Sequence, residues 1–360
     1  MSLKYSLPKG NGNGSTSLMR SLLIWGIPVL GWVALVIVFL YFLNGSEKDS
    51  EAIDAEPAPT EQTASTAATA TTPTAPTAPT PPKVPATASA APVFPSAPYD
   101  FSGAVSKLGL PKEAGCATGI IVDPMTRKVL WAKAADKAVP IASMTKMMTL
   151  LLAEEAIAAG KVTLATEIAV TPEASKIGGS QVWLDPRETF TLGELLKAVA
   201  IKSANDAAYL VGEFLGQGDA DAFVARMNAR AQAIGMVRTT FYDAHGLGDA
   251  SKRNNSASAH DMVLLGERLI AFPNALRLSS TPMDSFRGGK TELKNHNNLV
   301  FQRVPGVDGL KTGYTKASGF CVTLSCRRNG RRLLACVTGF TSAKDRDTFC
   351  KALLNWGYAH

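Results

Sequence analysis

An α/β fold with an antiparallel sheet is predicted for the larger part of this 360-residue chain, on three observations. Two apolar runs, 117–123 and 128–133, flank a turn and read as strands. Two later runs, 319–326 and 332–339, flank Asn329-Gly330, and Asn-Gly between such runs indicates a hairpin with a type I′ turn. The residues between these two pairs of strands are rich in Ala and Leu. We therefore expect a sheet built from both ends of a domain, with a helical insertion between them.

Four stretches have helical character. We expect helices over roughly 143–160, 191–215, 219–234 and 343–356. About 260 residues are enough for one hydrophobic core and lie at the upper end of single-domain size. Residues 98–360 are therefore predicted to form one domain.

An uncharged segment precedes this domain. Residues 21–43 carry no charge, and 23 residues of helix exceed the roughly 30 Å hydrocarbon core of a bilayer. A cleaved signal peptide has a shorter apolar core, so we expect an uncleaved transmembrane signal anchor. The tail 1–20 holds three basic residues and no acid, which places the N-terminus in the cytoplasm. The domain is then expected outside the cytoplasm, on a single-pass anchor in the inner (cytoplasmic) membrane.

Residues 44–97 are expected to be a disordered linker. Eleven of the 21 prolines of the chain lie between Pro57 and Pro98, mixed with Ala and Thr. Such a composition cannot form a core and favours an extended spacer.

The domain carries a net positive charge: from Phe101 onward it has 32 basic and 23 acidic residues, a net charge of +9. A nucleic-acid partner is not expected for a domain outside the cytoplasm.

Several kinds of chemistry lack their usual motifs. The four histidines are scattered, without His-Glu-x-x-His, and no paired Cys-x-x-Cys occurs, so no metal site is expected. The sequence contains no Gly-x-Gly-x-x-Gly, no phosphate-binding loop and no Gly-x-Ser-x-Gly. We expect no cofactor and no serine–histidine–acid triad.

Ser143-Met-Thr-Lys146 offers another nucleophile. Positions i and i+3 of a helix share one face, so a desolvated, neutral Lys146 can take the proton of the Ser143 hydroxyl. The first turn of a helix also adds unpaired N–H groups and the positive end of the dipole. This motif alone is weak, because Ser6-Leu-Pro-Lys9 has the same spacing and a plain helix N-cap would explain Ser143.

Two further motifs follow in order. Ser203-Ala-Asn205 is the only Ser-x-Asn in the chain and lies at a break in a helical region. Lys311-Thr-Gly313 is also unique and precedes the hairpin. Each alone is typical of a turn or a strand end, whereas all three together in this order are difficult to attribute to chance.

The three motifs together resemble class A β-lactamases and penicillin-binding proteins. The surrounding residues are similar to the low-molecular-weight D-alanyl-D-alanine carboxypeptidases, over about 98–356. The similarity includes 142–149, 203–207, Gly246-Leu247, 254–261, 295–299 and 306–315. The resemblance implies a β-lactamase/transpeptidase-like fold.

The resemblance also implies roles for particular residues. Ser143 would be the acylated nucleophile, Lys146 its base, and Ser203 the relay of a proton to the leaving amine. Asn205 would hold a substrate amide. Lys311, Thr312 and Gly313 would form the strand edge that binds the terminal carboxylate. Arg346 would bind that carboxylate too, and the N–H groups of Ser143 and Tyr314 would form the oxyanion hole.

Three features depart from the family pattern. Tyr314 stands where many relatives have His, which changes the side chain but not the backbone N–H. The similarity ends at the closing helix, without the C-terminal β-domain and amphipathic anchor of many relatives, so we expect 21–43 to replace that anchor. The five cysteines, an odd number, are expected to be mostly small buried core residues, although Cys321 and Cys336 are possible diagonal neighbours.

The expected activity is removal of the terminal D-alanine from peptidoglycan stem peptides, with β-lactams as covalent inhibitors. A D,D-endopeptidase that cuts crosslinks is the nearest alternative. A class A β-lactamase is disfavoured because no Glu-x-x-Leu-Asn follows Ser203. A non-catalytic wall-binding module is disfavoured because all three motifs are intact.

Overall fold

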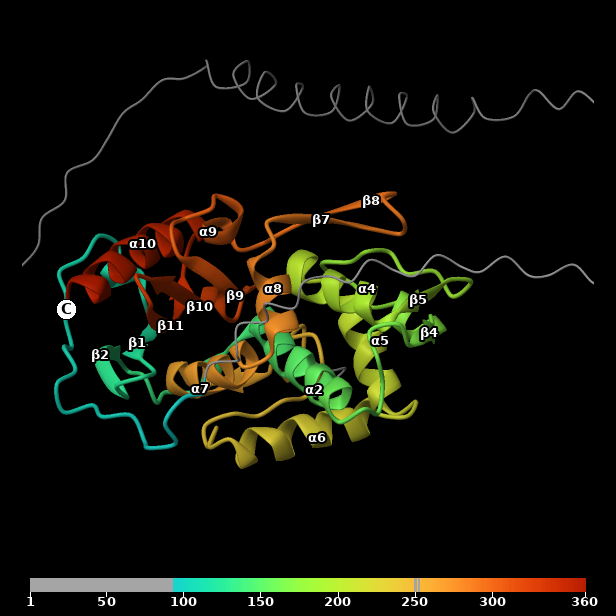
Figure 1. Ribbon diagram of the computed structural model, residues 1–360, viewed down its shortest axis with the longest axis horizontal. Coiled ribbons are helices and arrows are strands. Elements are labelled where there is room, and N and C mark those ends of the chain that lie inside the picture. Colours follow the sequence, from blue (N-terminus) through green and yellow to red (C-terminus); the bar gives the residue numbers. More distant parts are fainter. Residues whose placement is uncertain (1–92, 249–250, 252) are drawn as a thin grey trace, which may run out of the picture. The chain divides into compact units, whose positions relative to one another are not determined.

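The structure, a computed structural model, describes residues 93–248, 251 and 253–360. This part of the chain contains a five-stranded antiparallel sheet, which lies beside the helical insertion (Figure 1). The strand order is β2-β1-β11-β10-β9. The strands are β1 (Thr118–Asp123), β2 (Lys128–Lys133), β9 (Val307–Thr315), β10 (Gly319–Arg328) and β11 (Arg331–Phe340). The predicted fold class is thus confirmed: strands from both ends of the domain lie side by side in one antiparallel sheet.

The hairpin of β10 and β11 has the predicted turn. Arg328 pairs with Arg331, which leaves a loop of two residues, Asn329 and Gly330. Their φ angles are 50° and 81°, and a type I′ turn needs positive φ at both positions.

The edge strand β9 was not predicted from an apolar run, and only the family resemblance indicated a strand edge at Lys311, Thr312 and Gly313. It pairs with β10 over its whole length, with Lys311 opposite Thr323 and Thr312 opposite Val322. Its polar Lys-Thr-Gly sequence lacks the apolar pattern of a strand, yet Lys311 and Thr312 are buried. An apolar pattern cannot reveal a strand whose buried residues serve a polar site.

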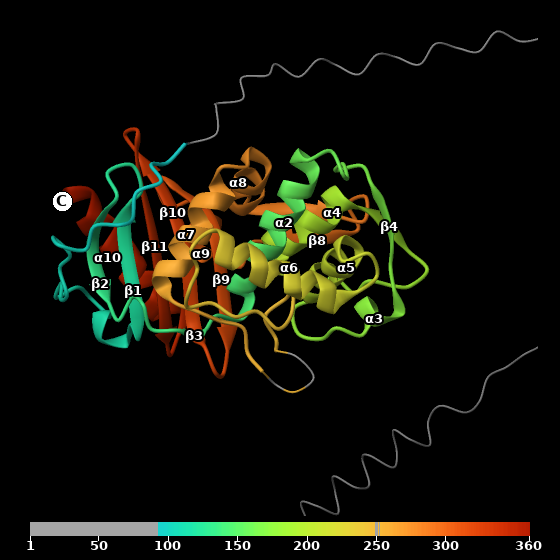
Figure 2. The same ribbon diagram turned by 90° about the horizontal axis from the view of Figure 1, so that it is seen from below.

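Helices cover both faces of the sheet (Figures 1 and 2). The closing helix α10 (Ala343–Ala359), predicted over 343–356, packs on one face with α9 (Asn298–Phe301). On the other face lie α2 (Lys146–Ala158), α7 (Ala259–Ile270) and α8 (Pro273–Ser280). The alternation of β11 matches these layers: Leu333 faces α10, whereas Leu334 faces the helical side.

The helical insertion has the predicted break at Ser203-Ala-Asn205. The helical stretch expected over 191–215 consists of three elements: α4 (Leu192–Lys197), the π-helical η3 (Ala198–Lys202) and α5 (Asn205–Leu215). They are interrupted at Ser203, whose φ of 61° no α-helix permits. The helix predicted at 219–234 is confirmed as α6 (Ala220–Ala233), and that at 143–160 as the 3₁₀ turn η2 (Ala142–Thr145) followed by α2.

Short elements complete the described part of the chain. Three two-stranded ribbons pair β3 (Val139–Pro140) with β6 (Ser256–Ala257), β4 (Glu167–Ala169) with β5 (Thr189–Thr191), and β7 (Met283–Phe286) with β8 (Thr291–Lys294). Two single turns are η1 (Glu113–Gly115) and α3 (Pro172–Ser175).

The residues that lead into the domain run along the β2 edge of the sheet. Asp100 forms a parallel bridge with Lys128, and Val105 forms one with Trp131. Arg127 ties this segment to α7, because its Nε donates to the carbonyl of Ala97 at 2.8 Å and its Nη1 pairs with Glu267 at 2.6 Å. This edge of the sheet is therefore covered, which removes a template for unwanted strand pairing.

The expected tail, the anchor at 21–43 and the linker up to residue 92 lie outside the described residues. Among the helices that the structure does describe, none has the length and apolar character to cross a membrane.

All five cysteines are buried and free. The prediction that the cysteines are small buried core residues is confirmed. Cys321 and Cys336 are both free thiols and form no disulfide with each other. Burial raises the pKa of the thiols of Cys116 and Cys321 to about 12, so neither is a reactive thiolate at neutral pH.

We expect none of the five thiols to react with iodoacetamide in the folded protein, because alkylation needs an accessible thiolate. Intact-mass measurement should show no adduct after an hour at pH 8 and five adducts after unfolding in urea. Rapid modification of the folded protein at Cys321 would contradict the buried position of this residue.

Candidate active site

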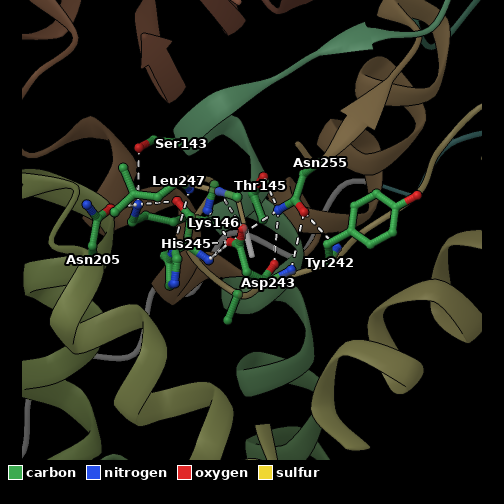
Figure 3. Close-up of polar contacts among 12 residues, drawn as sticks. Ser143, Thr145, Lys146, Asn205, Tyr242, Asp243, His245, Leu247 and Asn255 are labelled. Atoms are coloured by element: carbon green, nitrogen blue, oxygen red, sulfur yellow. Dashed lines mark hydrogen bonds and ion pairs between the residues drawn. The ribbon is translucent and has the colours of Figure 1, made fainter. Parts of the chain in front are cut away.

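Ser143 and Lys146 meet where η2 passes into α2. Ser143 lies in the 3₁₀ turn and is half-buried, and Lys146 is the first residue of α2 and is fully buried. Lys146 Nζ lies 3.1 Å from Ser143 Oγ (Figure 3). The spacing i, i+3 thus brings the two side chains together, as expected from the sequence.

Lys146 has two more acceptors, and both are neutral. Its Nζ donates to Asn205 Oδ1 at 2.6 Å and to the carbonyl oxygen of His245 at 2.6 Å. No carboxylate of the described residues forms an ion pair with it. Burial, with the nearby charge of Lys311, holds the pKa of Lys146 well below its usual value.

This arrangement suits a neutral amine. An ammonium group has three N–H donors, and after it loses one proton two remain for the oxygens of Asn205 and His245. The lone pair can then face Ser143 Oγ and accept its proton. The site therefore favours the neutral form of the lysine, and a neutral amine can act as a base.

Ser203 and Asn205 lie at the break between η3 and α5. Asn205 contacts Lys146 through its side-chain oxygen, and its Nδ2 donates to the carbonyl of Gly178 at 2.7 Å. Its backbone N–H donates to Ser180 O at 2.7 Å, which binds the 178–180 segment to the start of α5. Ser203, also buried, takes the left-handed conformation two residues earlier. Ser203 therefore belongs to neither η3 nor α5, and Asn205 is the first residue of α5.

Lys311 lies on the face of β9 that is turned toward the helical insertion. Its Nζ donates to the carbonyl of Thr312 at 3.1 Å. Burial, together with the nearby guanidinium of Arg346, lowers the pKa of Lys311 to about 7. The two buried lysines therefore interact: the charge of Lys311 contributes to the lowered pKa of Lys146.

Gly313 allows β9 to approach the nucleophile. A Cβ at this position would lie 2.6 Å from the carbonyl oxygen of Ile141 and 3.2 Å from the Cβ of Ala142. Any side chain would therefore push β9 away from the loop that carries Ser143. Thr312 and Tyr314 lie on the opposite face of the strand from Lys311, where Tyr314 is 54% exposed and stacks on Phe320 at 4.1 Å between ring centroids.

Arg346 reaches the same end of the sheet from α10. Its Nη1 lies 3.3 Å from the carbonyl of Cys321, the residue paired with Gly313. The guanidinium is buried and also donates to Asp347 Oδ1, from Nε at 2.9 Å and from Nη2 at 2.7 Å. Of its five N–H donors, two remain for another anion. Asp347 was not singled out from the sequence.

A loop that sequence reasoning left without a role positions Lys146. Asp243 accepts hydrogen bonds from the N–H groups of His245 and Gly248, at 2.7 and 2.8 Å, and from that of Gly246. This tight turn aims the carbonyl of His245 at Lys146 (Figure 3). The short Gly246-Leu247 match was the only signal for this loop in the sequence.

Asn255 connects this loop to the nucleophile turn. Its Oδ1 accepts from the N–H of Tyr242 at 2.7 Å, and its Nδ2 donates to Thr145 Oγ1 at 2.9 Å and to Asp243 O at 3.0 Å. Gly246 has a φ of 92° and touches the same turn, since a Cβ there would lie 2.1 Å from Ala142 O. The nucleophile turn is thus fixed between β9 and the 242–248 loop.

Among the described residues, one cavity lies beside this centre and another lies away from it. One of about 390 Å³ lies behind His245 and is lined by residues of α5, α6 and the 242–248 loop. A larger one of about 780 Å³ lies at the far ends of α2 and α5 and contains none of the expected site residues. The chemistry points to the Ser143 centre rather than to the larger cavity. Within the described residues no cluster of three His, Cys, Asp or Glu could hold a metal ion.

The family model for D-alanyl-D-alanine carboxypeptidase, peptidase family S11, matches residues 107–342. The chain therefore belongs to this family. It is 34% identical over 245 residues to D-alanyl-D-alanine carboxypeptidase DacF of Bacillus subtilis, and 33% identical over 246 residues to DacA of Escherichia coli. These matches cover 67% and 66% of the chain but only 62% and 60% of the relatives, less than two thirds of their length.

Solved structures are similar over the same region. Penicillin-binding protein D2 of Listeria monocytogenes, in its ampicillin-bound form, has a TM-score of 0.63 at 28% identity, covering 71% of this chain and all of that one. The D-alanyl-D-alanine carboxypeptidase of Mycobacterium tuberculosis has a TM-score of 0.64 at 26% identity, covering 72% of this chain and 95% of that one.

Asn255→Ala is expected to lower the free energy of unfolding by at least about 2 kcal/mol, because it leaves buried polar groups of Tyr242, Asp243 and Thr145 without partners. Urea unfolding followed by circular dichroism measures this. The control Asn355→Ala removes an exposed asparagine that accepts only from Arg328, and should change stability by less than about 0.5 kcal/mol. Equal effects of both variants would contradict a special role for Asn255.

Proposed function

We propose that the chain is a membrane-tethered serine D,D-carboxypeptidase that removes the terminal D-alanine of peptidoglycan stem peptides. One observation carries the proposal: the amine of Lys146 is buried without a carboxylate partner among the described residues and lies 3.1 Å from Ser143 Oγ. An ammonium buried in this way is destabilised, so the lysine is available as a base. The family membership supplies the substrate class.

Acylation begins with attack of Ser143 Oγ on the carbonyl carbon between the last two D-alanines. Lys146 Nζ takes the hydroxyl proton as the new C–O bond forms. The negative charge that develops on the carbonyl oxygen is bound by the N–H groups of Ser143 and Tyr314. The C–N bond then breaks, and the proton passes from Lys146 through Ser203 to the leaving amine. The products are D-alanine and an ester on Ser143.

Deacylation repeats these steps with water. Lys146 takes a proton from the attacking water, the ester bond breaks, and Ser143 regains its hydroxyl proton. The peptide leaves shortened by one residue.

Asn205 would hold the amide of the acyl half, and Lys311, Thr312 and Arg346 would bind the terminal carboxylate. The two free N–H donors of Arg346 support this assignment.

β-Lactams would acylate Ser143 in the same way, as the ampicillin-bound structure of the Listeria protein suggests.

For localisation we propose a single-pass anchor at 21–43 in the inner membrane, with the N-terminus in the cytoplasm and the catalytic domain outside it. The support is the uncharged run of 23 residues and the basic tail before it.

A fluorescent penicillin is expected to label the soluble domain covalently at Ser143. Ser143→Ala should abolish labelling, and Lys146→Met should slow it at least about a thousandfold, since base and nucleophile act as a unit. Gel fluorescence and the mass of the modified tryptic peptide measure both. Labelling that persists in Ser143→Ala would exclude this mechanism. Product analysis on pentapeptide and on crosslinked muropeptides separates the carboxypeptidase from the D,D-endopeptidase.

The rate of acylation is expected to rise with pH as Lys146 loses its proton. Because the charge of Lys311 lowers the pKa of Lys146, Lys311→Met should raise that pKa and shift the acid limb of the profile to higher pH. Second-order rate constants for penicillin labelling, normalised to each variant's maximum, report the shift between pH 5 and 10. Lys311→Arg retains the charge and should leave the limb in place; an unmoved limb in Lys311→Met would refute the coupling.

A further inference from the structure

Trp183 is the most exposed aromatic residue of the described chain, with 74% of its surface accessible. It lies in the segment between α3 and β5, and its neighbours Val182 and Leu184 are buried. Within the described residues its indole takes part in no ring stacking and no cation–π contact. The proposed reaction assigns no role to this side chain.

Two buried hydrogen bonds fix the backbone on either side of Trp183. Asp206, fully buried at the start of α5, accepts from the N–H groups of Val182 at 3.1 Å and of Leu184 at 3.2 Å. A buried N–H that loses its partner is costly, so these two contacts are retained. The backbone of residues 182–184 is therefore anchored to α5.

Arg287, in the turn between β7 and β8, holds the same backbone through its carbonyls. Its guanidinium donates to the carbonyl oxygens of Val182 and Trp183. The guanidinium also lies over the rings of Phe190 and Phe286, at 5.3 and 5.1 Å from their centroids, and these two rings stack on each other. Three elements, α5, β5 and β7, thus fix the peptide groups around one exposed side chain.

Trp183 adopts the left-handed backbone conformation, with a φ of 57°. Residues other than glycine rarely adopt it, because the Cβ is then crowded by the backbone. Such conformations persist where the surrounding structure enforces them, and they cluster at active sites and ligand sites. An exposed indole gains little from packing, so the framework around it indicates that the direction of the ring serves a ligand.

The same segment is joined to the nucleophile centre through Asn205. The carbonyl of Ser180 accepts from the N–H of Asn205, and that of Gly178 accepts from its Nδ2, both at 2.7 Å. Asn205 Oδ1 in turn lies 2.6 Å from Lys146 Nζ. Three residues of chain separate Ser180 from Trp183, a span of at most about 11 Å between their Cα atoms. Trp183 therefore lies near the centre, on the side of Asn205.

The charged side chains of this segment are all paired. Arg187 pairs with Asp185 at 2.6 Å, and Glu188 pairs with Arg287 at 2.7 Å. Between α3 and β5 the only other charged residue is Lys176, which adjoins α3. The indole therefore offers a large apolar face without a free charge beside it. Such a face favours a neutral, flat ligand, which is bound by dispersion and by removal of apolar surface from water.

We propose that Trp183 forms a sugar subsite on the acyl side of the catalytic centre. Its indole stacks on a pyranose ring of the glycan that carries the stem peptide, because the C–H face of such a ring is neutral and flat. This inference rests on the proposed function, in which Asn205 holds the acyl half. Four residues of a stem pentapeptide lie between the scissile bond and the glycan. They span at most about 14 Å, a reach comparable with that from Ser180 to Trp183.

Two substrates with the same pentapeptide test the subsite, one N-acetylated and one joined to the disaccharide of N-acetylglucosamine and N-acetylmuramic acid. The full-length protein is expected to cleave the disaccharide substrate with a kcat/KM about fivefold higher, because one stacked ring adds binding. The gain should appear in KM and leave kcat unchanged, since the sugar is remote from the reacting bond. Release of free D-alanine measures each rate.

Trp183→Ala should bring the ratio of the two kcat/KM values to about one, and Trp183→Phe should retain part of the preference. The matched control is Met125→Ala, which removes another exposed apolar side chain, in the turn between β1 and β2. That control should keep the fivefold ratio. Because the ratio is taken within one enzyme, a general loss of activity or stability does not imitate the effect.

A ratio of one in the unaltered protein, or an undiminished ratio in Trp183→Ala, would overturn the subsite. So would an equal loss of preference in Met125→Ala. Failure of the proposed function would appear differently, as no penicillin labelling of Ser143 and no release of D-alanine from the N-acetylated pentapeptide.

Discussion

Lys146 is fully buried beside oxygen atoms that carry no charge, and moving an ammonium group from water to such a place costs several kcal/mol. Much of the surrounding structure acts to keep it there. The Asp243 turn aims the carbonyl of His245, and α5 begins at Asn205 so that an amide oxygen lies opposite. A carboxylate in either place would restore the charge of the lysine and remove the base. The centre is therefore defined as much by the absence of an acid at these contacts as by its two motif residues.

Close backbone packing maintains this geometry. Gly313 and Gly246 bring β9 and the 242–248 loop against the turn that carries Ser143, from two directions. Two chain segments far apart in sequence thus determine the position of the nucleophile, and neither leaves room for a methyl group. The energetic cost of the buried amine is offset by the apolar core of α2, whose residues Met147, Met148 and Leu151 are fully buried.

Short sequence patterns predicted the features that depend only on neighbouring residues, namely the hairpin turn and the pairing of Ser143 with Lys146. Asn329-Gly330 defines its hairpin because both residues tolerate positive φ, and the pair of Ser143 and Lys146 follows from helical spacing. Polar residues that are buried at the site limited the prediction. β9 lacks an apolar pattern, so only the family resemblance indicated a strand edge there, and the sequence around the break at Ser203 did not reveal the π-helical turn before it. Asp347 was not singled out, and Asn255 was noted only as part of the similar segment 254–261, because the roles of both residues arise from contacts between distant segments that no local rule describes.

The segment along β2 has a mechanical consequence. The chain enters the domain at one edge of the sheet, through the bridges of Asp100 and Val105, whereas β9 forms the opposite edge. A pull on the chain before residue 97 would be transmitted to β2 and, through Arg127, to α7. Three strands separate that point from Lys311. Tension on the N-terminal side would therefore load the edge of the sheet opposite to β9 first.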